Sequence, residues 1–165
     1  MNQQRLKLIA ALLFPIVVLA TNAWMNQQQR DDGTAITLPI QGVDPRDLLS
    51  GHYLIFDVDY GIKAGYGCPV PDISATLCLD KETRVYPSDE LPTSCSLFLR
   101  GACNSQGDFS AGLERFYIPE KHASLLEKHI QANQGKLVLS INSQGQALIR
   151  DLLINDQSWR ESLDD

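Results

Sequence analysis

Residues 8–25 read Leu8-Ile-Ala-Ala-Leu-Leu-Phe-Pro-Ile-Val-Val-Leu-Ala-Thr-Asn-Ala-Trp-Met25 and contain no charged side chain. As a helix, this segment would be roughly 27 Å long, close to the thickness of the hydrocarbon layer of a bilayer. Arg5 and Lys7 precede it, and basic residues at this end favour an N-terminus that stays in the cytoplasm. The sequence therefore predicts a cytoplasmic N-terminus at 1–7, a transmembrane anchor at 8–25 and a body on the far side of the membrane.

The same segment also fits a secretory signal peptide. Its most apolar part, residues 8–20, has the length of a signal-peptide core, and Thr21-Asn22-Ala23 offers a small-residue cleavage site. Trp24 favours the uncleaved anchor, because tryptophan is enriched where a helix leaves the membrane. Both interpretations export the body.

The composition excludes some classes of function. Of 165 residues, 44% are apolar and 21% are charged, which is typical of a folded domain. The formal net charge is −6, and without Arg5 and Lys7 the rest of the chain has 12 basic against 20 acidic residues. Such an acidic body has no general attraction for phosphate backbones, and the sequence has no glycine-rich phosphate loop. Nucleic acid and nucleotides are therefore not expected partners.

The cysteines point to the same compartment. All four lie within 36 residues of the body, at Cys68, Cys78, Cys95 and Cys103, and an even number in an exported domain predicts two disulfides. If the segments on either side of a turn near residue 86 run antiparallel, Cys78 lies opposite Cys95 and Cys68 opposite Cys103. This nested pairing is one of three connectivities that the sequence leaves open. A zinc site is the alternative, but there is no Cys-x-x-Cys pair and no histidine among the four.

The body shows short apolar runs separated by turn residues. Strands are expected at residues 35–40, 52–60, 73–79, 83–86, 95–100, 112–118, 136–141 and 147–154. Residues 26–34 are polar and predict a tether, and 159–165 predict a C-terminal tail. The pattern predicts an α+β fold over 35–158, mainly an antiparallel β-sheet or small barrel with one packed helix.

That helix is expected at 120–134. Pro119 suits its start, and Gly135 would end it. The apolar stripe that would face the core consists of Leu125, Leu126 and Ile130.

A second, shorter helical turn is expected before the strand at 52–60. Asp44 can cap it, Pro45 suits the first helical position, and Asp47 lies where a carboxylate is favourable. Gly51 would end the turn in a left-handed conformation. Arg46 offers a partner for one of the neighbouring carboxylates.

Two stretches of the chain resemble one protein family. The segment Asp44-Pro-Arg-Asp-Leu-Leu-Ser-Gly-His-Tyr53 is similar to the opening of the membrane-anchored GDYXXLXY proteins, and so is Gly112-Leu-Glu-Arg-Phe-Tyr-Ile-Pro-Glu120 with the helix and hairpin after it. The naming motif matches in part. Gly51 and Tyr53 stand in place, whereas His52, Phe56 and Val58 replace Asp, Leu and Tyr.

The resemblance implies an anchored bacterial domain in the periplasm, without an assigned reaction. Such proteins accompany a polytopic membrane protein, so the resemblance implies an accessory subunit of the inner membrane. We expect the contact surface at the family motifs and their aromatic residues. The candidates are Asp44, Pro45, Arg46, Asp47, Gly51, Tyr53, Phe56, Arg115, Tyr117, Pro119 and Glu120.

Several groups could carry chemistry instead. The titratable cluster of Asp44, Asp47, His52, Asp57 and Asp59 could bind a metal or move a proton, but capping and a solvated strand face explain it as well. His122 and His129 are seven residues apart, whereas metal ligands on one helix are more often three or four apart. A serine–lysine dyad could be drawn from the serines and lysines of the sheet region, namely Lys63, Lys81, Ser74, Ser94 and Ser96.

None of these groups forms a recognisable motif, so we assign no catalytic, cofactor or metal residue. The alternatives to an accessory subunit are an anchored hydrolase or peptidase, and a cleaved, soluble ligand-binding domain of the periplasm.

Overall fold

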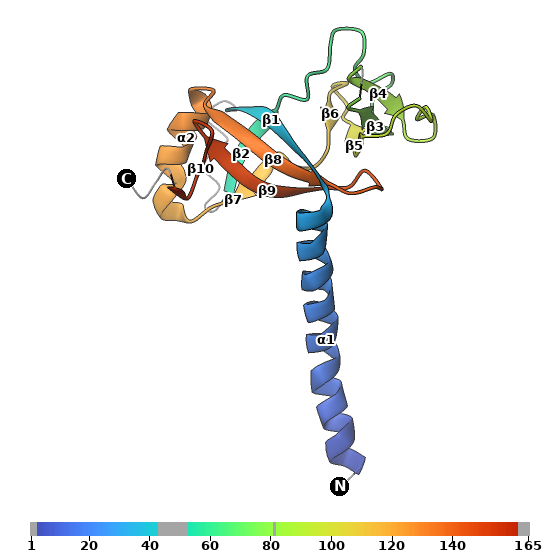
Figure 1. Ribbon diagram of the computed structural model, residues 1–165, viewed down its shortest axis with the longest axis vertical. Helices are drawn as coiled ribbons and strands as arrows, with labels where there is room; N and C mark the ends of the chain where they lie inside the picture. The colour runs from blue at the N-terminus through green and yellow to red at the C-terminus, as the bar shows by residue number, and fades with distance from the viewer. Residues whose placement is uncertain (1–2, 43–52, 81, 162–165) are drawn as a thin grey trace.

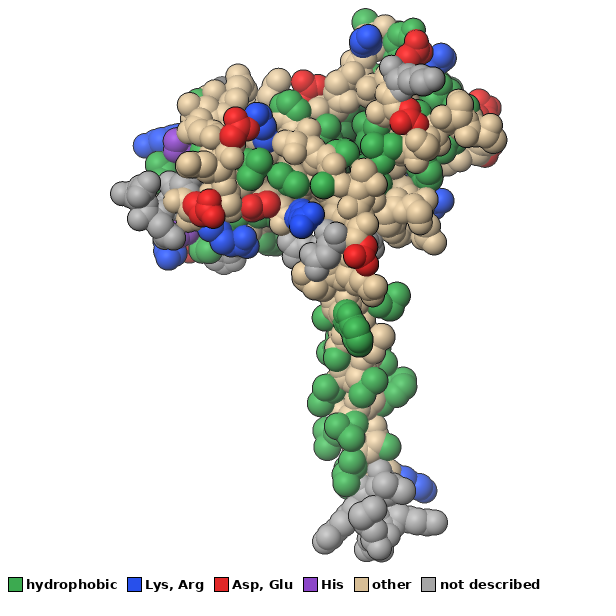
Figure 2. Space-filling model, viewed as in Figure 1, with side chains coloured by type: hydrophobic (Ala, Val, Ile, Leu, Met, Phe, Trp, Pro, Cys, Tyr) green, Lys and Arg blue, Asp and Glu red, His purple; other side chains and the backbone are tan. Residues whose placement is uncertain are grey.

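The computed structural model describes residues 3–42, 53–80 and 82–161, and shows one long helix standing away from a body of two β-sheets (Figure 1). The helix, α1, spans Gln3–Asp32, and its segment Lys7–Gln28 is long and apolar enough to cross a membrane. Its large apolar side chains are exposed on every side, as Phe14 at 72% and Leu19 at 70% illustrate. Figure 2 shows these apolar side chains along the part of the helix that stands away from the body.

The predicted tether at 26–34 is mostly helical in the structure. α1 continues without a break to Asp32, and Gly33 alone separates it from strand β1 (Thr34–Gly42). Glutamine is a good helix former, so residues 27–29 extend a helix that is already nucleated. The body is therefore joined to the apolar helix by a short connection, and α1 contacts β8 and β9 at its base.

The larger sheet has six antiparallel strands in the order β10-β9-β8-β1-β2-β7. After β1 come β2 (Tyr53–Val58), β7 (Arg115–Tyr117), β8 (Gly135–Ile141), β9 (Ala147–Ile154) and β10 (Gln157–Ser158). β2 alternates as expected, with Leu54 and Phe56 buried on the inner face. The predicted α+β fold, mainly of antiparallel sheet, is confirmed.

The smaller sheet has the order β4-β3-β5-β6 and lies between β2 and β7 in the sequence. Its strands are β3 (Ser74–Cys78), β4 (Arg84–Pro87), β5 (Phe98–Cys103) and β6 (Phe109–Ser110). Disulfides join Cys68 to Cys103 and Cys78 to Cys95, which confirms the nested pairing. Asp80 lies close to the sulfurs of Cys78 and Cys95, but both sulfurs are held in the disulfide and cannot act as thiolate ligands of zinc.

Helix α2 (Ala123–Gln131) follows the 3₁₀ turn η1 (Glu120–His122) and packs on β1 and β2. Leu126 and Ile130 are buried as predicted, but Leu125 is 44% exposed and does not belong to the buried stripe. The helix also ends earlier than predicted. Asn133 takes the left-handed conformation there, with φ of 56°, so Gly135 is free to begin β8 instead of stopping the helix.

The predicted C-terminal tail starts one residue too early. Trp159 is buried, and its ring lies edge-on to Phe116 at 6.2 Å and to His122 at 6.1 Å. The two-residue strand β10 runs back along β9 in antiparallel pairing, and this places the Trp159 side chain in the core. The core continues from there through both sheets.

Candidate protein-contact surface

Five of the predicted contact residues lie outside the described part of the chain. These are Asp44, Pro45, Arg46, Asp47 and Gly51. His52 lies outside it as well, so the structure bears neither on the short helical turn nor on a metal site there.

Three other candidates meet on the edge of the larger sheet. Tyr53 of β2 pairs in register with Tyr117 of β7, and their rings pack edge to face with centroids 5.9 Å apart. The guanidinium of Arg115 lies 5.6 Å from the centre of the Tyr53 ring. Tyr117 is 75% exposed. Tyr53, Arg115 and Tyr117 therefore form an exposed surface, here called the Tyr–Arg–Tyr patch.

The remaining candidates have other environments. Phe56 is fully buried in the core, because the alternation of β2 turns it to the inner face, and it is not available to a partner. Phe56 stands at the Leu position of the family motif, and the burial of this position suits a large apolar side chain. Pro119 precedes η1 in an extended conformation and Glu120 begins it, and both are exposed next to the end of β7.

A cleft of about 1060 Å³ adjoins the Tyr–Arg–Tyr patch, between the two sheets. Ile55 and Arg115 line it, and Ile55 shares the outer face of β2 with Tyr53, so the patch and the cleft form one continuous surface. Among the described residues, the cleft is lined by one cation, Arg115, and by four carboxylates: Asp57, Asp59, Asp108 and Glu114. This surface is acidic and offers an aromatic pair at one end.

A partly buried hydrogen-bond network closes the floor of the cleft. One oxygen of Glu114, Oε1, accepts hydrogen bonds from the Tyr60 hydroxyl (2.9 Å), the Ser110 hydroxyl (2.9 Å) and the Ala111 N–H (3.2 Å). Burial and the adjacent Glu114 carboxylate raise the pKa of the Tyr60 phenol far above its ordinary value. Tyr60 therefore stays protonated and donates. Neither Ser110 nor Glu114 was expected here, because only the folded chain brings residues 60 and 114 together.

Within the described part of the chain, no hydrogen bond joins a serine to a lysine among the groups considered for catalysis. The Ser96 hydroxyl donates to the Asp80 carboxylate at 2.9 Å, so its hydrogen-bond partner is an acid and not a lysine. Lys63 is exposed, and Lys81 lies outside the described residues. On α2, Nδ1 of His129 is 2.7 Å from the amide oxygen of Gln134.

Comparison with known proteins gives one match. A model of the family described as GDYXXLXY protein matches residues 15–152, which is most of the chain. The matched range begins inside α1 and ends in β9, so it includes the junction of helix and body, both disulfides and α2. A search of curated proteins and a search of solved structures each gave no match.

Proposed function

The chain belongs to the GDYXXLXY family, and we propose that it is a single-pass protein of the bacterial inner membrane that serves as a non-catalytic accessory subunit of a polytopic membrane protein. In this proposal residues 1–7 are cytoplasmic, 8–25 span the bilayer and the disulfide-bonded body is periplasmic. The body meets its partner through the Tyr–Arg–Tyr patch.

One observation carries the membrane-spanning part of the proposal. The large apolar side chains of α1 between Leu8 and Met25 are exposed, and the body does not pack against them. Burying a leucine or phenylalanine side chain is worth about 1.5–3 kcal/mol relative to leaving it in water. A helix that is apolar on all sides therefore needs lipid or other apolar helices around it. The same helix passes into the larger sheet within two residues, so the body stays close to the membrane surface.

The disulfides support the orientation. Disulfides persist in oxidising compartments such as the periplasm and are rare in the cytosol. Both lie in the body, on the C-terminal side of α1, while the basic residues Arg5 and Lys7 lie at the other end. The rule that basic residues stay inside gives the same direction.

The Tyr–Arg–Tyr patch supports a protein partner. Tyrosine and arginine are enriched among the residues that carry most of the binding energy in protein interfaces. In this patch the rings of Tyr53 and Tyr117 support each other, and Arg115 stacks on Tyr53, so little side-chain freedom remains to be lost on binding. The adjoining acidic cleft suits a basic segment of the partner.

Affinity purification of the tagged full-length protein in a gentle detergent tests the proposal, with intact-mass analysis of everything that elutes. We expect a polytopic protein in stoichiometric amount beside a chain that retains residues 1–23. The double variant Arg115→Ala/Tyr117→Ala should reduce the co-purified partner about tenfold, since truncating such residues costs roughly 1–2 kcal/mol or more.

The chain offers a matched control on the smaller sheet. Arg84 lies over the rings of Tyr66 and Tyr86, at 5.3 and 5.4 Å, in a second cluster of the same residue types. The variant Arg84→Ala/Tyr86→Ala removes the same groups and should leave the partner bound. A cleaved chain that elutes alone would refute the accessory-subunit proposal and favour a soluble ligand-binding domain.

A further inference from the structure

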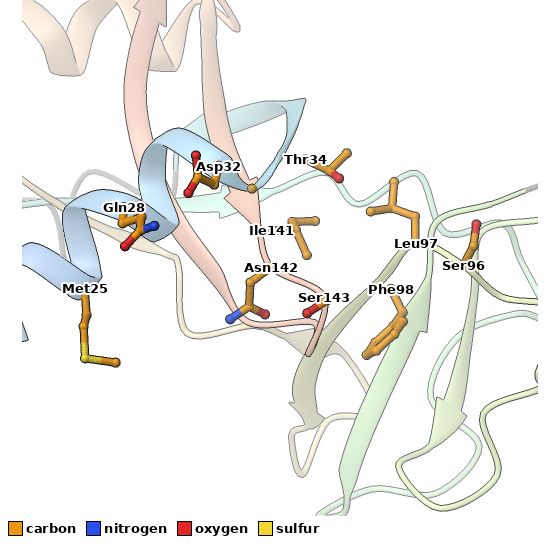
Figure 3. Close-up of a pocket in the computed structure, with 11 residues that line it drawn as sticks. Met25, Gln28, Asp32, Thr34, Ser96, Leu97, Phe98, Ile141, Asn142 and Ser143 are labelled. Carbon is orange, nitrogen blue, oxygen red and sulfur yellow. The ribbon is translucent and has the colours of Figure 1, made fainter.

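A second hollow lies at the base of α1, where the helix meets the body (Figure 3). Its volume is about 650 Å³, and no residue that lines it also lines the acidic cleft. The side chains of Met25, Gln28 and Asp32 border it on the helix side. Leu97 and Phe98, at the start of β5, border it on the opposite side.

The position of this hollow along α1 determines what it faces. The segment of α1 that is long and apolar enough to cross a membrane ends at Gln28, and Asp32 lies four residues further on, which is roughly 6 Å along the helix axis. The headgroup layer of a bilayer is roughly 5–8 Å thick on each side. When α1 spans the membrane over the segment Lys7–Gln28, the hollow therefore opens at the level of the phospholipid headgroups.

The charge of the hollow favours a cation. Asp32 is the one charged side chain that lines it among the described residues, and no basic side chain does so there. Asp32 is also the last residue of α1, and the unpaired carbonyls at a helix C-terminus carry a partial negative charge. Within the described part of the chain, the carboxylate of Asp32 and the amide of Gln28 have no hydrogen-bond partner.

The walls on the body side are held in place. The Arg100 N–H of β5 donates a 2.8 Å hydrogen bond to the Gly145 carbonyl, which ties the β8–β9 turn to the smaller sheet. Inside that turn, the Asn142 side-chain oxygen accepts from the N–H groups of Gln144 and Gln146 at 3.0 and 2.9 Å. These hydrogen bonds hold the body-side wall of the hollow in place without a ligand.

We infer that this hollow binds a phospholipid whose headgroup ends in a primary ammonium. Such a group carries N–H donors, and the hollow supplies acceptors: the Asp32 carboxylate, the Thr34 and Ser143 hydroxyls and the Gln28 amide oxygen. A quaternary ammonium has the same charge but no N–H to donate, and an anionic headgroup would be repelled by Asp32. The apolar Met25 side chain lies at the membrane side of the hollow, where the lipid chains begin. This inference rests on the membrane-spanning role proposed above.

Native mass spectrometry of the full-length protein tests the inference. The protein is released from detergent micelles that contain equal amounts of phosphatidylethanolamine, phosphatidylcholine and phosphatidylglycerol. We expect phosphatidylethanolamine adducts to exceed the other two by about two- to five-fold, the range for one exposed ion pair. Asp32→Asn should abolish this preference, and Asp32→Lys should turn it toward phosphatidylglycerol.

Asp89→Asn is the matched control, because it removes an exposed carboxylate from the turn after β4 and should leave the preference unchanged. Equal adducts of all three lipids on the wild-type protein, or a preference that survives Asp32→Asn, would overturn the inference. The chain mass in the same spectrum keeps the two proposals apart. An intact chain without lipid preference refutes this inference alone, whereas a chain that lacks residues 1–23 refutes the anchor and the lipid site together.

Discussion

The hydroxyl of Tyr60 donates a 2.9 Å hydrogen bond to Oε1 of Glu114, 54 residues away in the sequence. Tyr60 lies just after β2 and Glu114 just before β7, two strands that are neighbours in the larger sheet. The chain between them forms the smaller sheet and contains both disulfides. This hydrogen bond therefore joins the two points at which the smaller sheet is attached to the larger one.

Tyr60→Phe should destabilise the body by about 1–2 kcal/mol. The variant keeps the ring that packs against Phe109 but removes the donor to Glu114 and the acceptor for the Ala111 N–H. Thermal unfolding of the full-length protein in detergent, followed by circular dichroism, measures the change. Tyr86→Phe is the control, since its hydroxyl has no hydrogen-bond partner among the described residues, and an equal loss in both variants would contradict the role given to Tyr60.

The same hydrogen bond predicts that the stability of the folded body decreases at alkaline pH. The pKa of Tyr60 is raised in the folded state, so folding favours the neutral phenol. Its contribution is complete below the unfolded pKa of about 10 and is lost as pH rises from there toward the folded value. The stability difference between wild type and Tyr60→Phe should therefore shrink above about pH 10. In a titration followed by phenolate absorbance, one tyrosine of the wild type should ionise after the rest, and this late step should be missing in Tyr60→Phe.

The parts of the fold that local pattern determines were predictable. The alternation of Leu54 and Phe56 and the spacing of Leu126 and Ile130 each follow from the period of a strand or a helix. The predictions failed where a contact with a residue distant in the sequence determines burial or the bounds of a strand. Trp159 is buried only because β10 folds back along β9, and β5 begins at Phe98 instead of Cys95 because its register is set by β3.

The contact surface shows the same division. The sequence suggested Tyr53, Arg115 and Tyr117 separately, through the family motifs and the known preference of interfaces for aromatic residues. Their meeting depends on the pairing of β2 with β7 across more than fifty residues, which no local pattern reveals. Glu114 looked like an ordinary strand residue, since its three donors come from segments that only the folded chain brings together.

Removing the disulfides one at a time should lower the stability of the body by unequal amounts. Cys68–Cys103 closes a separation of 35 residues and Cys78–Cys95 one of 17, and in the chain-entropy model these are worth about 4 and about 3 kcal/mol. Replacing the first pair by serine should therefore lower the melting temperature more than replacing the second. Peptide mapping without reduction should find these two linkages. A Cys78–Cys103 peptide would show that the nested pairing is wrong.

Gly101→Ala adds a single methyl group to the smaller sheet and should disrupt the pairing of its strands. A Cβ at Gly101 would lie 2.3 Å from the Ser110 carbonyl oxygen and 2.6 Å from the Phe109 ring, closer than real Cβ contacts allow. Because one of these neighbours is the backbone of the paired strand β6, β5 and β6 would have to separate. We expect the variant to lose about 1–3 kcal/mol of folding stability.

The weakened β5–β6 pairing should expose the strand that leads to Ser110 and Glu114, so the loss of Gly101 should also loosen the floor of the acidic cleft. Hydrogen exchange of the amides in residues 98–111 measures this local opening. Gly67→Ala is the matched control, since a Cβ there meets nothing within 4 Å. Unchanged melting and exchange in Gly101→Ala would mean that β5 and β6 do not approach as closely as the structure shows.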